Sequence, residues 1–199
     1  MSAGAGAGAC LMVASIFTPI QGGSATVYAN LCRLAAPGTM VALATRRNYG
    51  DGQEIAGWRA HDAECGFPVY RMDLLRPAMM APPANKLVSA WRFLTIDLPL
   101  RAHLVAKVWS LIRKHRIRVI CIGELNSSAW LGRLFKTVLG IPVILYVHGE
   151  EITTRFSAGS FGRKRENYLR SADGVVSVSR FTEKALVEQM GVRPERVCL

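Results

Sequence analysis

The feature that most constrains the fold of this chain is an uninterrupted aliphatic run over 143–147, Val-Ile-Leu-Tyr-Val. A run without polar alternation is typical of a strand that is buried on both faces of a parallel sheet. In open α/β sheets ligands bind at the carboxyl ends of such strands. The position therefore predicts a site, and the alternative is an exposed polar turn after the strand. The residues that follow the run are His148, Gly149, Glu150 and Glu151.

Further apolar runs recur along the chain, and segments with helical periodicity separate them. Strands that alternate with helices over short loops indicate an α/β fold with a Rossmann-like, doubly wound, mainly parallel sheet. We expect about six parallel strands with helices on both faces. The other predicted strands lie at 11–18, 40–45, 69–72, 118–122 and 174–178, with a last one starting at 196.

The domain organisation is predicted as a flexible Ala/Gly-rich N-terminus over 1–10 and one domain over 11–199. No segment approaches the roughly 18 uninterrupted apolar residues that a membrane span needs. The first residues carry no basic side chain and make a poor secretory signal. The chain stops within an apolar, strand-like run, so we expect a truncated product or one half of a two-domain protein.

The five cysteines are scattered along the chain and show no C-x-x-C spacing. This pattern predicts reduced thiols, a cytoplasmic location, no disulfide framework and no metal site.

A glycine pair follows the first predicted strand. Gly22 and Gly23 precede Ser24, which is a candidate N-cap for the next helix. Bare backbone N–H groups beside a positive helix end suit a phosphate, although glycines also form tight turns that bind nothing. The apolar face of this helix is predicted from spacing as Val27, Leu31, Leu34 and Ala35.

The positive charge is concentrated in one segment. The formal net charge is +11, and 86–118 holds eight lysine or arginine residues against Asp97 alone. We expect a helix from 86 that breaks at Pro99 and resumes to about 115. A basic amphipathic helix can lie on anionic lipid, or its apolar stripe can face the sheet. The stripe comprises Leu87, Trp91, Leu94, Leu98, Val105, Val108, Trp109 and Ile112.

Three motifs together resemble the N-terminal domain of GT-B glycosyltransferases of family four. They are the Gly22–Gly23 pair, the Ile-Pro…Val-His-Gly-Glu run over 141–150 and the Ala-Asp-Gly-Val-Val-Ser-Val-Ser run over 172–179. The resemblance implies a retaining enzyme that moves a sugar from a nucleotide-sugar donor, itself the substrate rather than a cofactor, to a glycan or lipid-linked acceptor. It also implies a second, donor-binding domain with the cationic groups and paired glutamates of that family.

The resemblance assigns roles to particular residues. Gly22 and Gly23 are expected to approach the donor phosphates, and His148 is expected to lie beside the transferred sugar as the catalytic residue. We expect His148 to serve the site rather than to support the fold, and Ser179 to act mainly as a helix cap. Because no donor-side residue is present in this chain, we expect little activity from it alone. The predicted substrate-binding residues are Gly22, Gly23, Gly149, Glu150, Arg46 and Asn126.

Two other functions remain open. The first is a nicotinamide- or nucleotide-dependent oxidoreductase; no G-x-G-x-x-G follows the first strand, but Arg46 and Arg47 after the second could hold a 2′-phosphate. The second is a non-catalytic basic module that binds a membrane or nucleic acid. The chain has no RNP, helix-turn-helix or zinc spacing, which disfavours nucleic acid. On an anionic membrane the chain would be peripheral, at the inner face.

Overall fold

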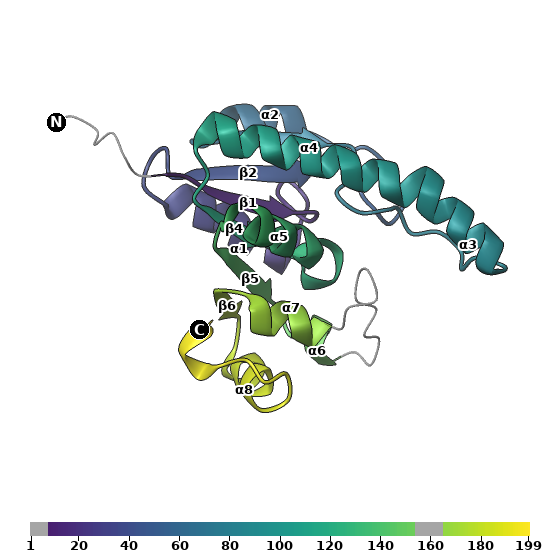
Figure 1. The fold of residues 1–199 in the computed structure, drawn as a ribbon. Coiled ribbons are helices and arrows are strands. Elements are labelled where there is room, and N and C mark those ends of the chain that lie inside the picture. The colour runs from purple at the N-terminus through teal and green to yellow at the C-terminus, as the bar shows by residue number, and fades with distance from the viewer. Residues whose placement is uncertain (1–7, 154–164) are drawn as a thin grey trace.

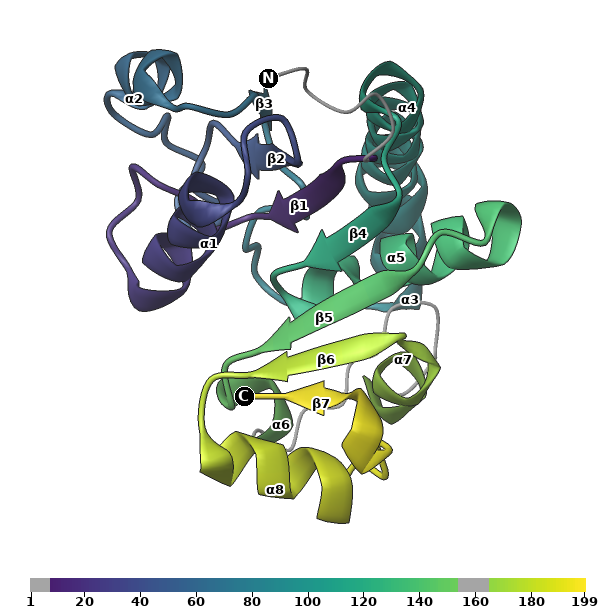
Figure 2. The same ribbon diagram turned by 90° about the vertical axis from the view of Figure 1, so that its left-hand side faces the viewer.

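The computed structural model describes residues 8–153 and 165–199. They form a seven-stranded sheet in the order β3-β2-β1-β4-β5-β6-β7, and every neighbouring pair of strands is parallel (Figures 1 and 2). The predicted Rossmann-like α/β fold is confirmed. The strands are β1 (Cys10–Ala14), β2 (Met40–Thr45), β3 (Val69–Met72), β4 (Val119–Ile122), β5 (Val143–Val147), β6 (Gly174–Ser177) and β7 (Val197–Cys198).

Helices cover both faces of the sheet. Figure 2 shows α1 and α2 on one side and α4, α5 and α7 on the other, while α8 packs at the β6–β7 end. The helices are α1 (Gly23–Leu34), α2 (Trp58–Glu64), α3 (Lys86–Arg92), the π-helical η1 (Phe93–Asp97), α4 (Leu98–His115), α5 (Leu125–Leu139), α6 (Glu150–Thr153), α7 (Arg165–Ser171), α8 (Arg180–Glu188) and the 3₁₀ turn η3 (Pro194–Arg196).

β5 is an inner strand, as its unbroken apolar run predicts. It pairs with β4 on one side and β6 on the other, and four of its five residues are buried. Its side chains contribute to two apolar cores, one on each face of the sheet. Leu145 belongs to the larger core with the residues of α4 and α5, and Tyr146 to the smaller core beneath α1.

The predicted apolar face of α1 is wrong. Val27, Leu31 and Leu34 are exposed, and Ala35 follows the helix as its C-cap. The helix instead packs against the sheet with small side chains around one tyrosine, which allows its backbone to approach β1 and β2 closely. Ser24 lies inside the helix and Gly22 occupies the N-cap position, without a capping side chain. The buried residues of α1 are Ala25, Tyr28, Ala29 and Cys32.

Several predicted boundaries also differ from the structure. β1 ends at Ala14 rather than at Thr18, because the backbone N–H groups of the next two residues donate to the Glu124 carboxylate instead of to a neighbouring strand. Glu124 also occupies the N-cap position of α5, without a side-chain capping hydrogen bond. The polar stretch before residue 66 contains α2, which buries none of its residues and so shows no apolar period.

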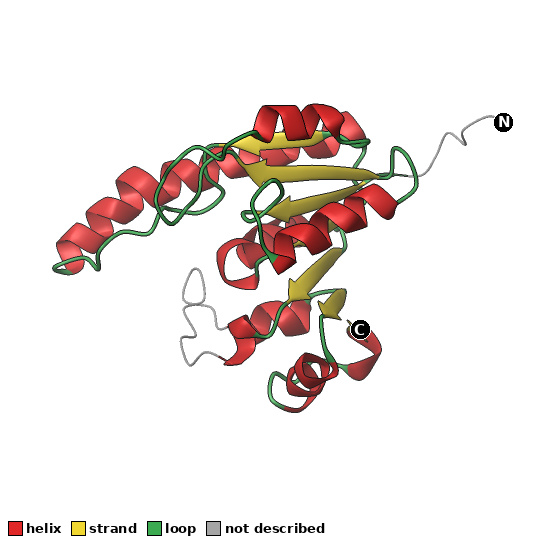
Figure 3. Cartoon of the chain, turned by 180° about the vertical axis from the view of Figure 1, so that it is seen from behind, coloured by secondary structure: helices red, strands yellow, loops and turns green. Residues whose placement is uncertain are grey.

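The basic helical segment continues through Pro99 without a break. The π-helical η1 joins α3 to α4 and ends at Asp97, two residues before Pro99, so the change of helical winding falls where proline would otherwise interrupt a regular α-helix. In Figure 1, and from behind in Figure 3, α3 projects beyond the carboxyl ends of the strands. The apolar row Leu87, Trp91, Leu94 and Leu98, here called the α3 row, is exposed, whereas α4 buries Leu104, Val108 and Leu111. Of the stripe predicted along α4, Val108 is buried and Val105 and Ile112 are partly buried against the core, whereas Trp109 is 42% exposed.

The expected flexible N-terminus falls largely outside the described residues, which begin at Gly8. Ala9 is 4% exposed and Cys10 opens β1, so these two residues belong to the fold. All five cysteines are free thiols. No three His, Cys, Asp or Glu side chains within 8–153 and 165–199 gather closely enough to hold a metal ion. None of the described helices is both long and apolar enough to cross a bilayer.

Candidate functional site

A pocket of about 210 Å³ lies where β1, β4 and β5 end; we call it the His148 pocket. Its walls come from the segments that follow these three strands, from α1 and from the loops after β2 and β3. This is the edge of the sheet at which open α/β folds bind ligands. The lining residues are Ile16, Ser24, Tyr28, Tyr49, Arg76, Glu124, Asn126, His148, Glu150 and Glu151.

His148 is held by a tyrosine from α1. Its Nε2 lies 2.5 Å from Oη of Tyr28, and the two rings meet edge to face with 5.4 Å between their centroids. The same Oη lies 2.5 Å from the carbonyl oxygen of Gly123. A carbonyl oxygen can only accept, so the tyrosine O–H donates to Gly123, and Nε2–H of His148 donates to Tyr28. In the neutral ring this assigns Nδ1 as a hydrogen-bond acceptor, and no described residue donates to it.

Tyr28 keeps its proton in this arrangement. Burial raises the pKa of its hydroxyl well above the usual value, and the nearby carboxylates of Glu124 and Glu151 raise it further. The hydroxyl is therefore a permanent donor to Gly123, so the tautomer of His148 is set by the fold rather than by solvent.

The two carboxylates also have defined partners. Glu124 accepts hydrogen bonds from the backbone N–H groups of Ser15, at 2.8 Å, and Ile16, at 3.0 Å, which ties the end of β1 to the end of β4. Desolvation raises the pKa of Glu124 despite these two donors. Glu151 Oε2 accepts from the backbone N–H of His148 at 3.0 Å. The backbone on both sides of the pocket is therefore fixed by carboxylates.

Gly149 turns the chain out of β5 with a φ of 99°, in the left-handed region that favours glycine. An added Cβ would lie 3.1 Å from Oγ1 of Thr182, so the position is also crowded by α8. The predicted cap of α8 is confirmed, since Oγ of Ser179 accepts from the N–H of Thr182.

The charge of the His148 pocket is acidic. Glu124, Glu150 and Glu151 stand against one guanidinium, that of Arg76, which lies 4.4 Å from the centre of the Tyr49 ring. Carboxylates are strong acceptors for the hydroxyl groups of a sugar. The same carboxylates repel a phosphate, so the pocket suits a polyhydroxylated ligand better than a diphosphate.

The structure brings most of the predicted site residues together. His148, Glu150 and Asn126 line one pocket, and Gly149 joins two of them. Gly22 and Gly23 precede the lining residue Ser24 and are fully open, since an added Cβ at either would have no atom within 4 Å. Their openness leaves room for a ligand but does not by itself require glycine.

Arg46 lies apart from this group. Its guanidinium forms an ion pair with Asp73 and lines a second pocket, beside α4. Of the two arginines expected to hold a 2′-phosphate, Arg46 is thus paired with a carboxylate, and Arg47 donates to the carbonyl oxygen of Gly52 at 3.1 Å.

Sequence reasoning missed Tyr28 and Glu124. Glu124 follows the last residue of β4 after one glycine, so its position relative to a strand end was available as a signal. Tyr28 could be found only by choosing the correct face of α1, and the apolar period pointed to the other face.

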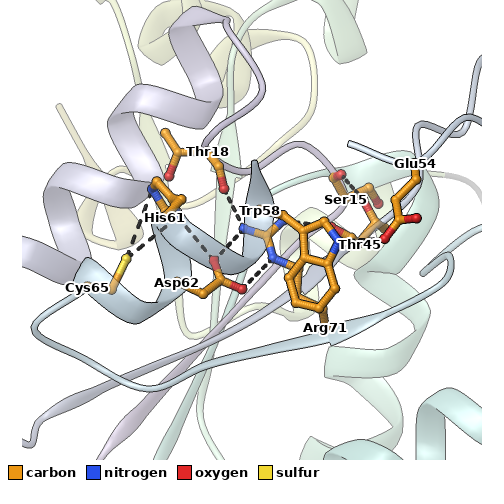
Figure 4. A network of polar contacts seen from close by, with 9 residues as sticks. All are labelled: Ser15, Thr18, Thr45, Glu54, Trp58, His61, Asp62, Cys65 and Arg71. Atoms are coloured by element: carbon orange, nitrogen blue, oxygen red, sulfur yellow. Dashed lines mark hydrogen bonds and ion pairs between the residues drawn. The ribbon is translucent and has the colours of Figure 1, made fainter. Parts of the chain in front are cut away.

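Arg71, another cation near this edge, is bound into the fold (Figure 4). Its Nε and Nη2 donate to the two carboxylate oxygens of Asp62, both at 2.8 Å. Nη1 donates to the carbonyl of Thr45 at 2.7 Å, and Nη2 donates to that of Thr18 at 2.5 Å. Four of its five N–H groups are used in this way and its side chain is 2% exposed, so its main role is to join α2 and β3 to the segments after β1 and β2.

The same network contains a cysteine beside a histidine. Sγ of Cys65 lies 3.7 Å from Nδ1 of His61, which also contacts Asp62 at 3.0 Å (Figure 4). Burial raises the pKa of the Cys65 thiol, which keeps it protonated. A nucleophilic cysteine requires the opposite shift, so Cys65 lacks the lowered pKa of a reactive thiol.

Comparison with known proteins supplies a family and a fold. The model of the family described as glycosyl transferase 4-like domain matches residues 21–199. No curated protein matches the chain in sequence.

Solved structures share the fold at low identity. HepE of Anabaena, solved in complex with UDP-glucose, is 14% identical with a TM-score of 0.56, over 96% of this chain and 43% of that one. Sucrose-phosphate synthase of Thermosynechococcus elongatus is 15% identical with a TM-score of 0.58, over 92% and 45%. UGT89C1 of Arabidopsis thaliana, complexed with UDP-L-rhamnose, is 14% identical with a TM-score of 0.53, over 97% and 48%. The chain spans less than half the length of each of these proteins.

Proposed function

Because the chain belongs to the glycosyl transferase 4-like domain family, we propose that it forms the acceptor-side half of a retaining glycosyltransferase. The enzyme moves a sugar from a nucleotide-sugar donor to a glycan or a lipid-linked acceptor, and it uses no cofactor besides the donor. The observation that carries this proposal is the fixed tautomer of His148 within a pocket of carboxylates at the carboxyl ends of the strands.

His148 is proposed to hold the transferred sugar through Nδ1. With Nε2–H committed to Tyr28, Nδ1 accepts a hydrogen bond from a sugar hydroxyl. Glu150 and Asn126, from the same pocket, accept from or donate to further hydroxyl groups. A hydrogen bond to an atom that moves during transfer lowers the barrier when it is stronger in the transition state than in the bound substrate.

The donor diphosphate is proposed to lie outside the His148 pocket. The open backbone at Gly22 and Gly23 begins α1, where N–H groups favour an anion when the cleft closes. One guanidinium against three carboxylates cannot neutralise a leaving diphosphate, so that role falls to cations of a second, donor-binding domain.

A peripheral position on the cytoplasmic face of an anionic membrane is part of the proposal. The exposed α3 row lies on a helix of the most basic segment of the chain. An apolar row next to lysine and arginine is the composition of helices that lie in a membrane interface, and it would bring a lipid-linked acceptor to the site.

The test compares two histidines with the same contacts. His115 also lies against a tyrosine, with Nε2 2.8 Å from Oη of Tyr70 and an edge-to-face ring distance of 5.5 Å, but it does not line the pocket. His148→Ala and His115→Ala are therefore each expected to lose roughly 1 kcal/mol of unfolding free energy, the typical value of one hydrogen bond.

Only His148→Ala is expected to lower transfer. In a protein that carries a donor-binding domain, kcat and kcat/KM should both fall on the order of 10- to 100-fold. The measurements are steady-state transfer from nucleotide sugars and thermal unfolding. Equal activity per folded molecule in the two variants would make His148 a structural residue and remove the proposed site.

A further inference from the structure

A second and larger cavity, of about 650 Å³, lies between α4 and the loop that follows β3; we call it the α4 pocket. Both of its walls are mainly apolar. The loop contributes Leu74, Pro77 and Met80, and the helical side contributes Ile96 and Leu100. An apolar cavity of this size with a few polar groups is typical of a small-molecule site.

The α4 pocket holds one cation without an acidic partner. Of its three cations, Arg46 pairs with Asp73, and Arg71 pairs with Asp62. Lys107 is half-buried, its Nζ lies 5.1 Å from the centre of the Tyr70 ring, and it forms no ion pair with any described carboxylate. A partly desolvated ammonium gains most from an anion that enters with it.

The lining that α4 contributes changes from apolar to polar along the helix. Leu100, His103 and Lys107 follow the i, i+3, i+7 spacing and line the pocket from one face of α4. From Pro99 to Lys107 the helix rises about 12 Å. The apolar end lies toward η1 and α3, where the lining residues Met80 and Ile96 are themselves exposed near the α3 row.

We propose that the α4 pocket binds an anionic amphiphile. Its anionic group pairs with Lys107 beside His103, and its apolar chain lies along Leu100 and Ile96 toward α3. The proposal takes this ligand to be the lipid carrier of the acceptor, an assignment that rests on the proposed function, whereas the binding itself does not.

The position of the pocket supports the carrier assignment. The loop after β3 forms part of both pockets, with Arg76 in the wall of the His148 pocket and Pro77 in that of the α4 pocket. The two pockets therefore share one loop. The apolar end of the same pocket opens toward the exposed α3 row, which is the proposed membrane contact.

The binding test uses octyl phosphate below its micelle concentration, with inorganic phosphate and the neutral octyl glucoside as comparison ligands. In calorimetric titrations of this chain, octyl phosphate is expected to bind at least about tenfold more tightly than either, because only it satisfies both ends of the pocket. Equal binding of octyl glucoside, or absence of octyl phosphate binding, would overturn the proposal.

Substitutions on α4 test whether octyl phosphate binds at Lys107. Lys107→Gln is expected to weaken octyl phosphate about tenfold, as for the loss of one charge-assisted contact, and Lys107→Arg to restore it. Arg113→Gln removes the same charge from an exposed position on α4 outside the pocket and is expected to change nothing. Equal weakening by Arg113→Gln would show general charge attraction and contradict the site. Circular dichroism checks that each variant is folded.

A competition experiment separates the carrier from bulk lipid. Phosphatidylglycerol vesicles are expected to leave octyl phosphate binding intact, and displacement by them would assign the pocket to membrane lipid and overturn the carrier assignment. Loss of transfer in His148→Ala does not depend on octyl phosphate. If that variant transfers normally while octyl phosphate still binds at Lys107, the proposed function fails and the binding site stands.

Discussion

Two histidine–tyrosine pairs lie at opposite edges of the sheet. His115 ends α4 before β4 begins, at the amino edge, and burial lowers the pKa of its ring. His148 follows β5 at the carboxyl edge. The two pairs share a hydrogen bond and a ring geometry, so the contact alone does not define a functional histidine. The proposal that His148 is the functional one rests on its strand end, because ligands of open α/β sheets bind at the carboxyl edge.

The raised pKa of Glu124 makes a prediction about pH. The pKa of the Glu124 carboxyl is higher in the folded state than its unfolded value of 4.5, so the folded state binds more protons. The unfolding free energy of the wild type therefore decreases as pH rises from about 4.5 through the folded pKa. Glu124→Gln cannot ionise. The unfolding free energy of the variant relative to the wild type is therefore expected to shift in favour of the variant between pH 4.5 and 7.

The measurement is denaturant unfolding of both proteins across that pH range. In the variant the NH2 group of the glutamine amide replaces one carboxylate oxygen and faces a backbone N–H group of Ser15 or Ile16. The lost hydrogen bond lowers the unfolding free energy by an amount that does not depend on pH. A difference that stays constant with pH, or moves in favour of the wild type, would show that Glu124 is not desolvated.

For individual residues of the candidate site, the sequence identifies those that directly follow a strand and misses those whose position depends on tertiary packing. His148 and Glu150 were predicted because position along the chain is enough to place them at a strand end. The partner of His148 is Tyr28, which is 120 residues away in sequence. Nothing local marks such a contact, because the fold brings the two elements together across the sheet.

The α3 row is an exposed apolar surface on a helical segment. Leu87 is 82% exposed and Trp91 68% exposed, on a helix that projects past the sheet (Figure 1). An exposed patch of this kind marks an interaction surface. The surrounding positive charge favours anionic lipid, with each basic residue near the membrane contributing about 1 kcal/mol.

Trp91→Glu is expected to weaken binding to anionic vesicles roughly tenfold or more, because it removes apolar area and adds a negative charge. Leu34→Glu is the matched control, since Leu34 is 85% exposed on α1 and lies outside the α3 row. It is expected to bind as the wild type does.

Vesicle co-sedimentation measures both variants, at low and high salt. Salt is expected to weaken wild-type binding because it screens the charges. Equal affinity for neutral and anionic vesicles would contradict the membrane proposal, and so would an equal effect of the two substitutions.

The bounds of β5 and β2 agree with their apolar runs, since these inner strands have no polar side to blur their ends. The bounds of the edge strand β3 also agree, although only Met72 of it is buried. α2 was missed because it buries none of its residues. The predicted buried face of α1 was wrong because alanine and cysteine add little to a hydrophobic pattern, although they form the contact of this helix with the sheet.

For the whole molecule, the acidic His148 pocket predicts a division of labour. The described residues around it cannot neutralise a diphosphate, so this chain alone is expected to show little or no sugar transfer. Fusion to a donor-binding domain of the same family is expected to produce transfer. Nucleotide-sugar turnover by the chain and by the fusion measures this, and turnover by the chain alone near the rate of the fusion would contradict it.

The fold class was predictable because alternation of buried runs with helical segments leaves few topologies. The separation of the His148 pocket from the α4 pocket was not predictable from the sequence. Arg46 follows a strand as His148 does, but its pairing with Asp73 directs it to the α4 pocket. An ion pair across 27 residues leaves no pattern in either segment.

The placement of β1 in the middle of the sheet sets the order in which the chain is able to fold during synthesis. β1 pairs with β2, where Cys10 meets Met40, and with β4, where Cys10 meets Val119. On the ribosome, at 5–20 residues per second, the interval between completion of Thr45 and of Ile122 is about 4 to 15 s. Throughout it, one edge of β1, a buried inner strand, has no partner. Nascent chains halted within this interval are therefore the species in which chaperone binding, or aggregation through β1, is concentrated.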